Sequence, residues 1–155
     1  MRRTAERRRR RCWFAELKAE ALAWWVRRAS DDRLQAVMCS RLRGILLWQI
    51  FRTIRQRAQP ETRLNAVVEF RISGRRDGGI DHYQLMLADG RCRTSRRGTR
   101  RPALTLELEP VPFLRLVAGT VSAQRLLITG KLKVRGSVRV ARALPAALRL
   151  PGRQH

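Results

Sequence analysis

The spacing of apolar residues changes twice along this chain, from helical to alternating and back to helical. In the first 60 residues the helical spacing predicts two amphipathic helices, one ending near Arg28 and one running from Asp31 to about Gln56. Ser30 is the expected N-cap of the second helix, and Pro60 is expected to end it. The N-terminal part is therefore expected to be helical.

From about residue 64 to residue 109, apolar and polar residues alternate, as in strands with one buried face. The alternating segments surround Phe70, Leu85 and Leu106, and a short later segment surrounds Val134. The dipeptide Asp89-Gly90 predicts a tight hairpin turn. Strands joined by short turns predict an antiparallel or mixed sheet with one face in water.

Short helical segments follow the strands and are expected to cover the apolar face of the sheet. One ends at Gly119, a residue suited to a C-terminal cap, and the next has Ser122 as its N-cap. A closing helix is expected to start after Ser137 and to be stopped by Pro145, after Leu144. The predicted class is α+β, with two N-terminal amphipathic helices, a sheet and small covering helices.

Several of these segments occur in an order and spacing that resembles the sterol carrier protein 2 (SCP2) family, in its bacterial type. They are Asp77-Gly78-Gly79, Leu85–Gly90, Leu104-Thr105-Leu106, Phe113-Leu114 with Gly119, and Thr129–Gly136. The resemblance divides the chain into a basic tail with an amphipathic helix at 1–30 and an SCP2-like lipid-binding domain at 31–155. The core of that domain spans residues 64–150.

The resemblance implies non-enzymatic binding and transfer of a sterol, a fatty acyl chain or another lipid in an apolar cavity. It implies no cofactor and no metal. The positions that match the family's lining are Phe113, Leu116, Val117, Leu126, Leu127, Ile128, Leu132 and Val134. Ordinary core packing is the alternative for each of them, because a lipid tunnel is a core with a gap in it.

The net charge of +23 suggests an anionic partner, although its predominance of arginine also fits a background bias in composition. A lipid carrier must approach a bilayer, and tryptophan beside arginine suits the headgroup region. The expected membrane-contact residues are Trp13, Trp24, Trp25, Arg27 and Arg28. Packing of the tryptophans on the sheet or on a partner subunit is the alternative.

Nucleic-acid binding is the main rival function, because arginines crowd the segment Arg91–Arg101. That segment contains no aromatic residue on which a base could stack, so this function is not favoured. A third alternative is an accessory factor that presents a lipid to a partner enzyme.

An enzyme is not expected, because no catalytic motif occurs. His82 and its neighbour Asp81 should point to opposite faces of a strand, so they cannot form a dyad. Cys92, between two arginines, could have a lowered pKa, but an ordinary surface thiol is favoured. Without a signal-peptide core or a peroxisomal C-terminal tripeptide, the expected location is the cytoplasm, peripherally at the membrane.

Overall fold

The computed structural model describes residues 20–60, 63–96 and 98–149. Its centre is a five-stranded sheet with the order β3-β2-β1-β4-β5. The strands are β1 (Ala66–Ile72), β2 (Asp81–Ala88), β3 (Arg91–Ser95), β4 (Leu104–Leu108) and β5 (Leu132–Gly136). The helices are α2 (Asp31–Met38), α3 (Arg43–Arg57), α4 (Pro110–Val117), α5 (Ala123–Ile128) and α6 (Val138–Leu148), preceded by a helical segment at residues 20–28.

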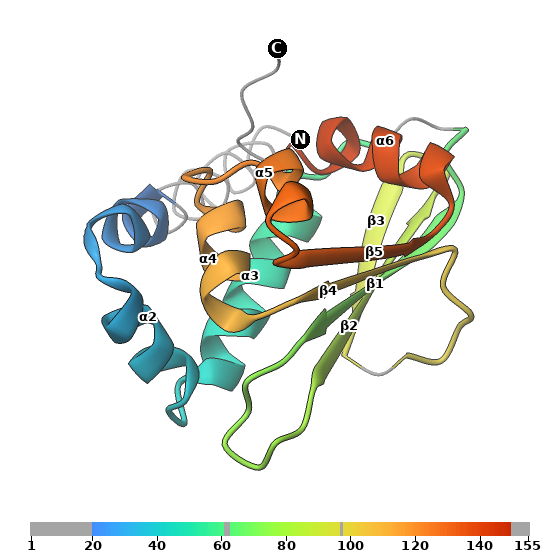
Figure 1. Ribbon diagram of the computed structural model, residues 1–155. Coiled ribbons are helices and arrows are strands. Elements are labelled where there is room, and N and C mark those ends of the chain that lie inside the picture. The colour runs from blue at the N-terminus through green and yellow to red at the C-terminus, as the bar shows by residue number, and fades with distance from the viewer. Residues whose placement is uncertain (1–19, 61–62, 97, 150–155) are drawn as a thin grey trace, which may run out of the picture.

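The helices gather on one side of the sheet. Figure 1 shows α3 and α4 beside the strands and α2 farther out, where it packs against α4. The α+β fold predicted from the sequence is confirmed. None of the helices in the described part of the chain combines the length and the apolar character that crossing a bilayer requires.

The sheet is mixed, because one of its pairings is parallel. Strands β1–β2, β2–β3 and β4–β5 pair antiparallel, whereas β1 and β4 run in parallel at the centre. Residue Val68 of β1 is there opposite Leu104 of β4. The chain must therefore cross the sheet between β3 and β4 to start β4 beside β1.

The predicted hairpin at Asp89-Gly90 is confirmed. Ala88 and Arg91 are paired residues, which leaves a two-residue loop. Both loop residues have positive φ, 51° at Asp89 and 71° at Gly90, as a type I′ turn requires. This turn fixes the register of β2 against β3.

Serine side chains cap the helices where the sequence predicted caps. The hydroxyl oxygens of Ser30, Ser122 and Ser137 accept hydrogen bonds from backbone amides in the first turns of α2, α5 and α6. Gly119 follows the end of α4 with φ of 74°, and its amide donates to the carbonyl of Leu116.

The long helix predicted from Asp31 to about Gln56 is wrong in one respect, since it is broken between Met38 and Arg43 into α2 and α3. The Ser40 hydroxyl donates to the carbonyl of Val37 at 2.6 Å, an interaction that competes with the helical pattern. The side chain of Arg43 is buried and bonded to β1 and β2, so the chain must turn to place it there.

The predicted end of the last helix at Leu144 is also wrong, because α6 continues through Pro145 to Leu148. Proline removes one helical hydrogen bond and disfavours this geometry. Leu144, Ala147 and Leu148 are nevertheless buried, and their packing keeps the last turn helical.

The core lies between the sheet and the helices. Phe51 of α3 is at its centre, with ring centroids 4.1 Å from Tyr83, 5.4 Å from Phe70 and 5.7 Å from Phe113. Val26 belongs to the same core with 1% of its surface exposed. The division of the chain at residue 30 stays a prediction, but residues on both sides of it share this core.

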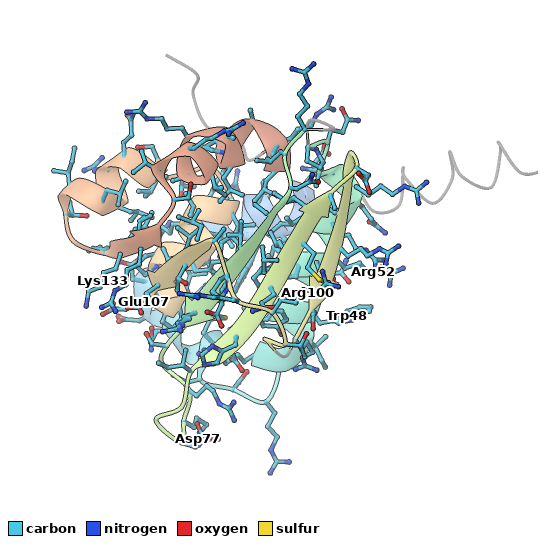
Figure 2. The ribbon with its side chains drawn as sticks, turned by 90° about the vertical axis from the view of Figure 1, so that its right-hand side faces the viewer. Trp48, Arg52, Asp77, Arg100, Glu107 and Lys133 are labelled. Atoms are coloured by element: carbon cyan, nitrogen blue, oxygen red, sulfur yellow. The ribbon has the colours of Figure 1, made fainter. Side chains whose placement is uncertain are left out.

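The opposite face of the sheet is polar and is partly covered by the β3–β4 connection. The side chain of Gln84 is buried and bonds the backbone of Arg100 twice, donating to its carbonyl at 2.8 Å and accepting from its amide at 3.4 Å. Figure 2 shows Arg100 in front of the strands on this face. Glu69, also buried, is 3.1 Å from Nδ1 of His82 and 3.3 Å from Arg71.

Candidate functional site

An apolar cavity of about 200 Å³ lies among the 20–28 helix, α3, α4 and the end of α6. Its apolar lining consists of Leu22, Ala23, Val26, Ile50, Ile54, Leu114, Val117, Ala118 and Leu148. Its polar lining consists of Glu20, Arg27, Thr53, Arg57 and Arg149. The cavity therefore combines apolar walls with a group of positive charges.

Helical periodicity explains how the walls arise. Residues three and four apart in a helix share a face, so Ile50 and Ile54 lie together on α3. Leu114, Val117 and Ala118 form the corresponding stripe on α4. The small side chain of Ala118, which is only 3% exposed, leaves room between the helices at the inner part of this wall.

Arg115 attaches the wall formed by the 20–28 helix to α4. Its guanidinium donates to the carbonyl oxygens of Val26 and Ala29, both at 3.2 Å, at the end of that helix. It also donates to the carboxylate of Asp31 at 2.6 Å. A cation at a helix C-terminus satisfies carbonyls that have no helical partner and complements the helix dipole.

Arg27, Arg57 and Arg149 supply the positive charge of the cavity. Within the described ranges, none of the three forms an ion pair. Glu20 is the acidic residue in the lining, so positive charge prevails there. Such a lining can accept a hydrocarbon chain whose polar end is anionic.

Of the lining positions predicted from the family resemblance, Val117 lines this cavity. Phe113, Leu116, Leu126 and Leu132 are buried in the core, and Val134 is partly buried against it. Leu127 and Ile128 of α5 are exposed, by 46% and 87%. The roles of these residues in lipid binding stay predictions.

The lining from α3 and from the 20–28 helix was missed by the sequence reasoning. The available signal is the helical spacing of Ile50 and Ile54, which the sequence analysis does not single out. A stripe of this kind does not reveal which partner helix leaves a gap beside it.

The predicted membrane-contact residues are distributed over more than one environment. Trp24 is 56% exposed, with the guanidinium carbon of Arg28 4.5 Å from the centre of its ring. Trp25 packs against the core, and Arg27 lines the cavity. Trp13 lies outside the described residues.

The arginines of the segment Arg91–Arg101 do not form one patch. Strand alternation places Arg91 and Arg93 on the polar face, opposite Ala88 and Met86. Arg96 lies on the helical side, with its guanidinium carbon 6.0 Å from the Tyr83 ring centre. Arg97 lies outside the described residues.

Neither of the two side chains weighed for catalysis lies in the cavity. His82 contacts Glu69 on the polar face, at Nδ1–Oε1 3.1 Å, a pairing that the sequence reasoning missed. Burial raises the pKa of the Cys92 thiol to about 11, so this cysteine is not a simple surface thiol and is not activated. The described residues contain no group of three or more His, Cys, Asp or Glu side chains placed to hold a metal ion.

The model of the SCP-2 sterol transfer family matches residues 49–149. The chain belongs to this family. The match covers α3 from Gln49 onward, the whole sheet and the helices from α4 to α6, and it confirms the resemblance inferred from the sequence. Three walls of the cavity lie within it, while the 20–28 helix precedes it.

The chain is similar in sequence to a "Fatty acid-binding protein" from Yarrowia lipolytica. The two are 31% identical over 96 residues, which cover 61% of this chain and 74% of that protein. The crystal structure of sterol carrier protein 2 like 2 from Aedes aegypti has a TM-score of 0.55 at 16% identity, covering 66% of this chain and 96% of that one. The sec-alkylsulfatase Pisa1 from Pseudomonas sp. gives 0.54 at 13% identity, covering 74% of this chain but 17% of that enzyme. The two structures support the fold alone.

Proposed function

We propose that this protein is a non-enzymatic lipid carrier that holds part of a hydrocarbon chain in the cavity between the 20–28 helix, α3, α4 and α6. The observation that carries the proposal is an apolar cavity whose lining includes three arginines that form no ion pair with other described residues. Family membership and a relative whose name is "Fatty acid-binding protein" support the same ligand class.

The size of the cavity limits what it holds without rearrangement. An apolar cavity of about 150 Å³ can accommodate benzene, and ligand pockets are usually about 300–1,000 Å³. A cavity of about 200 Å³ therefore accepts a segment of a chain, and a whole sterol or long acyl chain requires the helices to separate. Each methylene that enters contributes about 0.8 kcal/mol.

The charges favour an acyl ligand with an anionic head over a neutral sterol. A carboxylate at the end of the cavity could accept charge-assisted hydrogen bonds from Arg27, Arg57 or Arg149. A neutral hydroxyl would leave these guanidinium groups with weaker partners. The proposed ligand is therefore a fatty acid or a similar amphiphile with an acidic head.

Filling the cavity tests the proposal. Ala118→Leu should place extra methyl groups in the cavity, leave the melting temperature unchanged or higher, and weaken binding of hexadecanoate measured by native mass spectrometry and calorimetry. The matched control is Ala36→Leu at an exposed position of α2. Hexadecanoate binding that survives Ala118→Leu at full strength would contradict the proposed site.

Overpacking could destabilise Ala118→Leu, so Val117→Phe at the half-buried edge of the cavity provides a second filling variant. A folded Val117→Phe protein with unchanged affinity would equally count against the site. Purified protein that contains no lipid and binds neither fatty acids nor sterols would remove the carrier function altogether.

We propose in addition that the carrier docks on anionic membranes through the exposed ring of Trp24 and the adjacent Arg28. Both residues belong to the helix that forms one cavity wall, so docking would bring the cavity to the bilayer. Co-sedimentation with phosphatidylserine vesicles should fall in Trp24→Ala and should fall only partly with salt, because ring burial is not screened. Attachment that vanishes with salt, and that Trp24→Ala leaves intact, contradicts this docking mode.

A further inference from the structure

A second cavity, of about 360 Å³, lies on the other side of α3, between this helix and the strands β2 and β3. Three arginines line it, Arg52 and Arg55 from α3 and Arg96 from the end of β3. No acidic residue lines this hollow within the described part of the chain. Figure 2 shows Trp48 and Arg52 next to each other beside the edge of the sheet.

The absence of carboxylate partners distinguishes these arginines from others in the fold. Arg43, Arg75 and Arg115 each form an ion pair with an aspartate. In the described residues, Arg52, Arg55 and Arg96 form none. Three guanidinium groups around one hollow repel one another, and an anion between them would relieve that repulsion.

Tyr83 provides a second, independent indication of a ligand. Its side chain lines the same cavity, and only 3% of the residue is exposed. Its hydroxyl is buried and makes no hydrogen bond of good geometry to a described residue, although the guanidinium of Arg96 lies close enough to offset part of the rise that burial causes in its pKa. A buried hydroxyl without a partner is destabilising, and such a group in a native fold needs an explanation.

The ring of Tyr83 is held in place by stacking on Phe51, with centroids 4.1 Å apart. The hydroxyl oxygen therefore cannot move toward another partner without disturbing the core, although its hydrogen can rotate. Burial raises the pKa of Tyr83 more than the neighbouring Arg96 lowers it, so the hydroxyl stays a donor as in an ordinary tyrosine.

Guanidinium forks and a phenolic donor suit an oxyanion with several oxygens, and arginine is favoured where phosphate is bound. Trp48, 47% exposed with the Arg52 guanidinium carbon 5.0 Å from its ring centre, adds an aromatic surface at the rim. We propose that the hollow between α3 and β3 binds the phosphate group of an organic phosphate, independently of the chain-binding cavity. The source is either a phospholipid headgroup or a soluble phosphate ester.

Calorimetry at constant ionic strength provides the first test, with inorganic phosphate and glycerol 3-phosphate as probes and chloride as the background anion. The Arg55→Gln/Arg96→Gln variant should lower phosphate affinity at least tenfold. The control, Arg91→Gln/Arg93→Gln, removes the same charge from the polar face of β3 and should leave the affinity within about twofold. Equal losses in the two variants would mean general charge attraction and would overturn the site.

Tyr83→Phe separates the built site from a cluster of surface charges. It removes the unpartnered hydroxyl without changing the ring, so the protein should stay folded and be at least as stable. Phosphate affinity should fall roughly tenfold or more, the usual effect of losing a hydrogen bond to a charged group. Unchanged affinity in folded Tyr83→Phe would also overturn the proposal.

Vesicles distinguish the two sources. If the headgroup is the ligand, phosphatidic acid in phosphatidylcholine vesicles should bind in a manner that requires Arg55, Arg96 and Tyr83, and glycerol 3-phosphate should compete weakly. If a soluble ester is the ligand, glycerol 3-phosphate should bind with the same residue dependence and vesicles should not. Oligonucleotide binding that depends on Arg91 and Arg93 as much as on Arg55 and Arg96 would replace the site with a nucleic-acid surface.

Discussion

The buried side chain of Arg43 provides the sharpest test of how this fold is held together. Its guanidinium donates to the carboxylate of Asp81 at 2.7 Å and to the carbonyl oxygens of Ile72 at 2.9 Å, Ser73 at 2.7 Å and Met38 at 3.3 Å. Only 7% of the Arg43 side chain is exposed. One side chain therefore joins the break between α2 and α3 to the ends of β1 and β2.

Arg43→Met should destabilise the protein by about 3 kcal/mol. Removing one partner of a buried ion pair costs roughly 3–5 kcal/mol. The low end applies because the Asp81 side chain is 21% exposed and keeps a second contact with Arg75 at 3.4 Å. For a chain of this length, such a loss lowers the melting temperature by roughly 6–12 °C.

Arg75→Met is the matched control, because it removes the same charge beside the same carboxylate. The Arg75 side chain is 42% exposed, so its loss should cost less than about 1 kcal/mol. Arg43→Lys should be intermediate, since an ammonium group retains the charge but cannot reach all four acceptors. Urea unfolding of the four proteins measures these differences, and equal losses for Arg43→Met and Arg75→Met would refute the anchoring role of Arg43.

Three further predictions follow from burial and charge. Phe113→Ala should lower the free energy of unfolding in urea by about 3–5 kcal/mol, because Phe113 is fully buried against Phe51. Val117→Ala at the cavity edge should lower it by about 1 kcal/mol but reduce ligand affinity more than Phe113→Ala does. A larger loss of ligand affinity in Phe113→Ala would place the ligand at Phe113. Arg57→Gln should weaken hexadecanoate binding roughly tenfold and leave binding of the neutral alcohol hexadecanol unchanged; parallel losses for acid and alcohol would show that Arg57 does not contact the head. Burial raises the pKa of Cys92 from 9.0 to about 11, so the folded state holds this proton more tightly than the unfolded state. The contribution of this thiol to the free energy of unfolding is complete below pH 9 and is lost as the pH rises toward 11. Wild type should therefore lose stability relative to Cys92→Ala between about pH 9 and pH 10.5. Superimposable curves of unfolding free energy against pH for the two proteins would count against a buried thiol.

Local signals in the sequence predicted the secondary structure well. The Asp89-Gly90 turn, the serine caps and the alternating strands each depend on residues close together in the chain, and all are found in the structure. The two errors in helix bounds depend largely on contacts between distant parts of the chain, with the local Ser40–Val37 hydrogen bond adding to the first. The break before Arg43 reflects bonds from its side chain to β1 and β2, and the continuation through Pro145 reflects core packing of the residues around it.

The cavity was harder to predict than the fold. The family resemblance directed attention to α4, α5 and β5, where Val117 does line the cavity and Ile128 is exposed. The gap itself depends on how far apart four helical segments pack, and apolar periodicity does not encode that spacing. The grouping of arginines in space was equally hard to predict. Arg93 and Arg96 are close in sequence, but strand alternation and the direction of the following loop place them on opposite faces of the sheet.

The parallel pairing of β1 with β4 also sets an order for folding. The paired residues Arg71 and Glu107 are 36 positions apart in the chain, whereas the hairpin partners Ala88 and Arg91 are separated only by their turn. Since closing a long loop costs more entropy and takes more time than closing a short one, we expect β1–β2–β3 to form first and β4–β5, whose connection holds α4 and α5, to follow before the two parts join. Until they join, the inner edge of β1 is an unpaired, apolar strand edge, the kind of surface on which chains associate wrongly. Strand β1, which is at the centre of the native sheet, is thus the strand at greatest risk of pairing wrongly while the protein is being made.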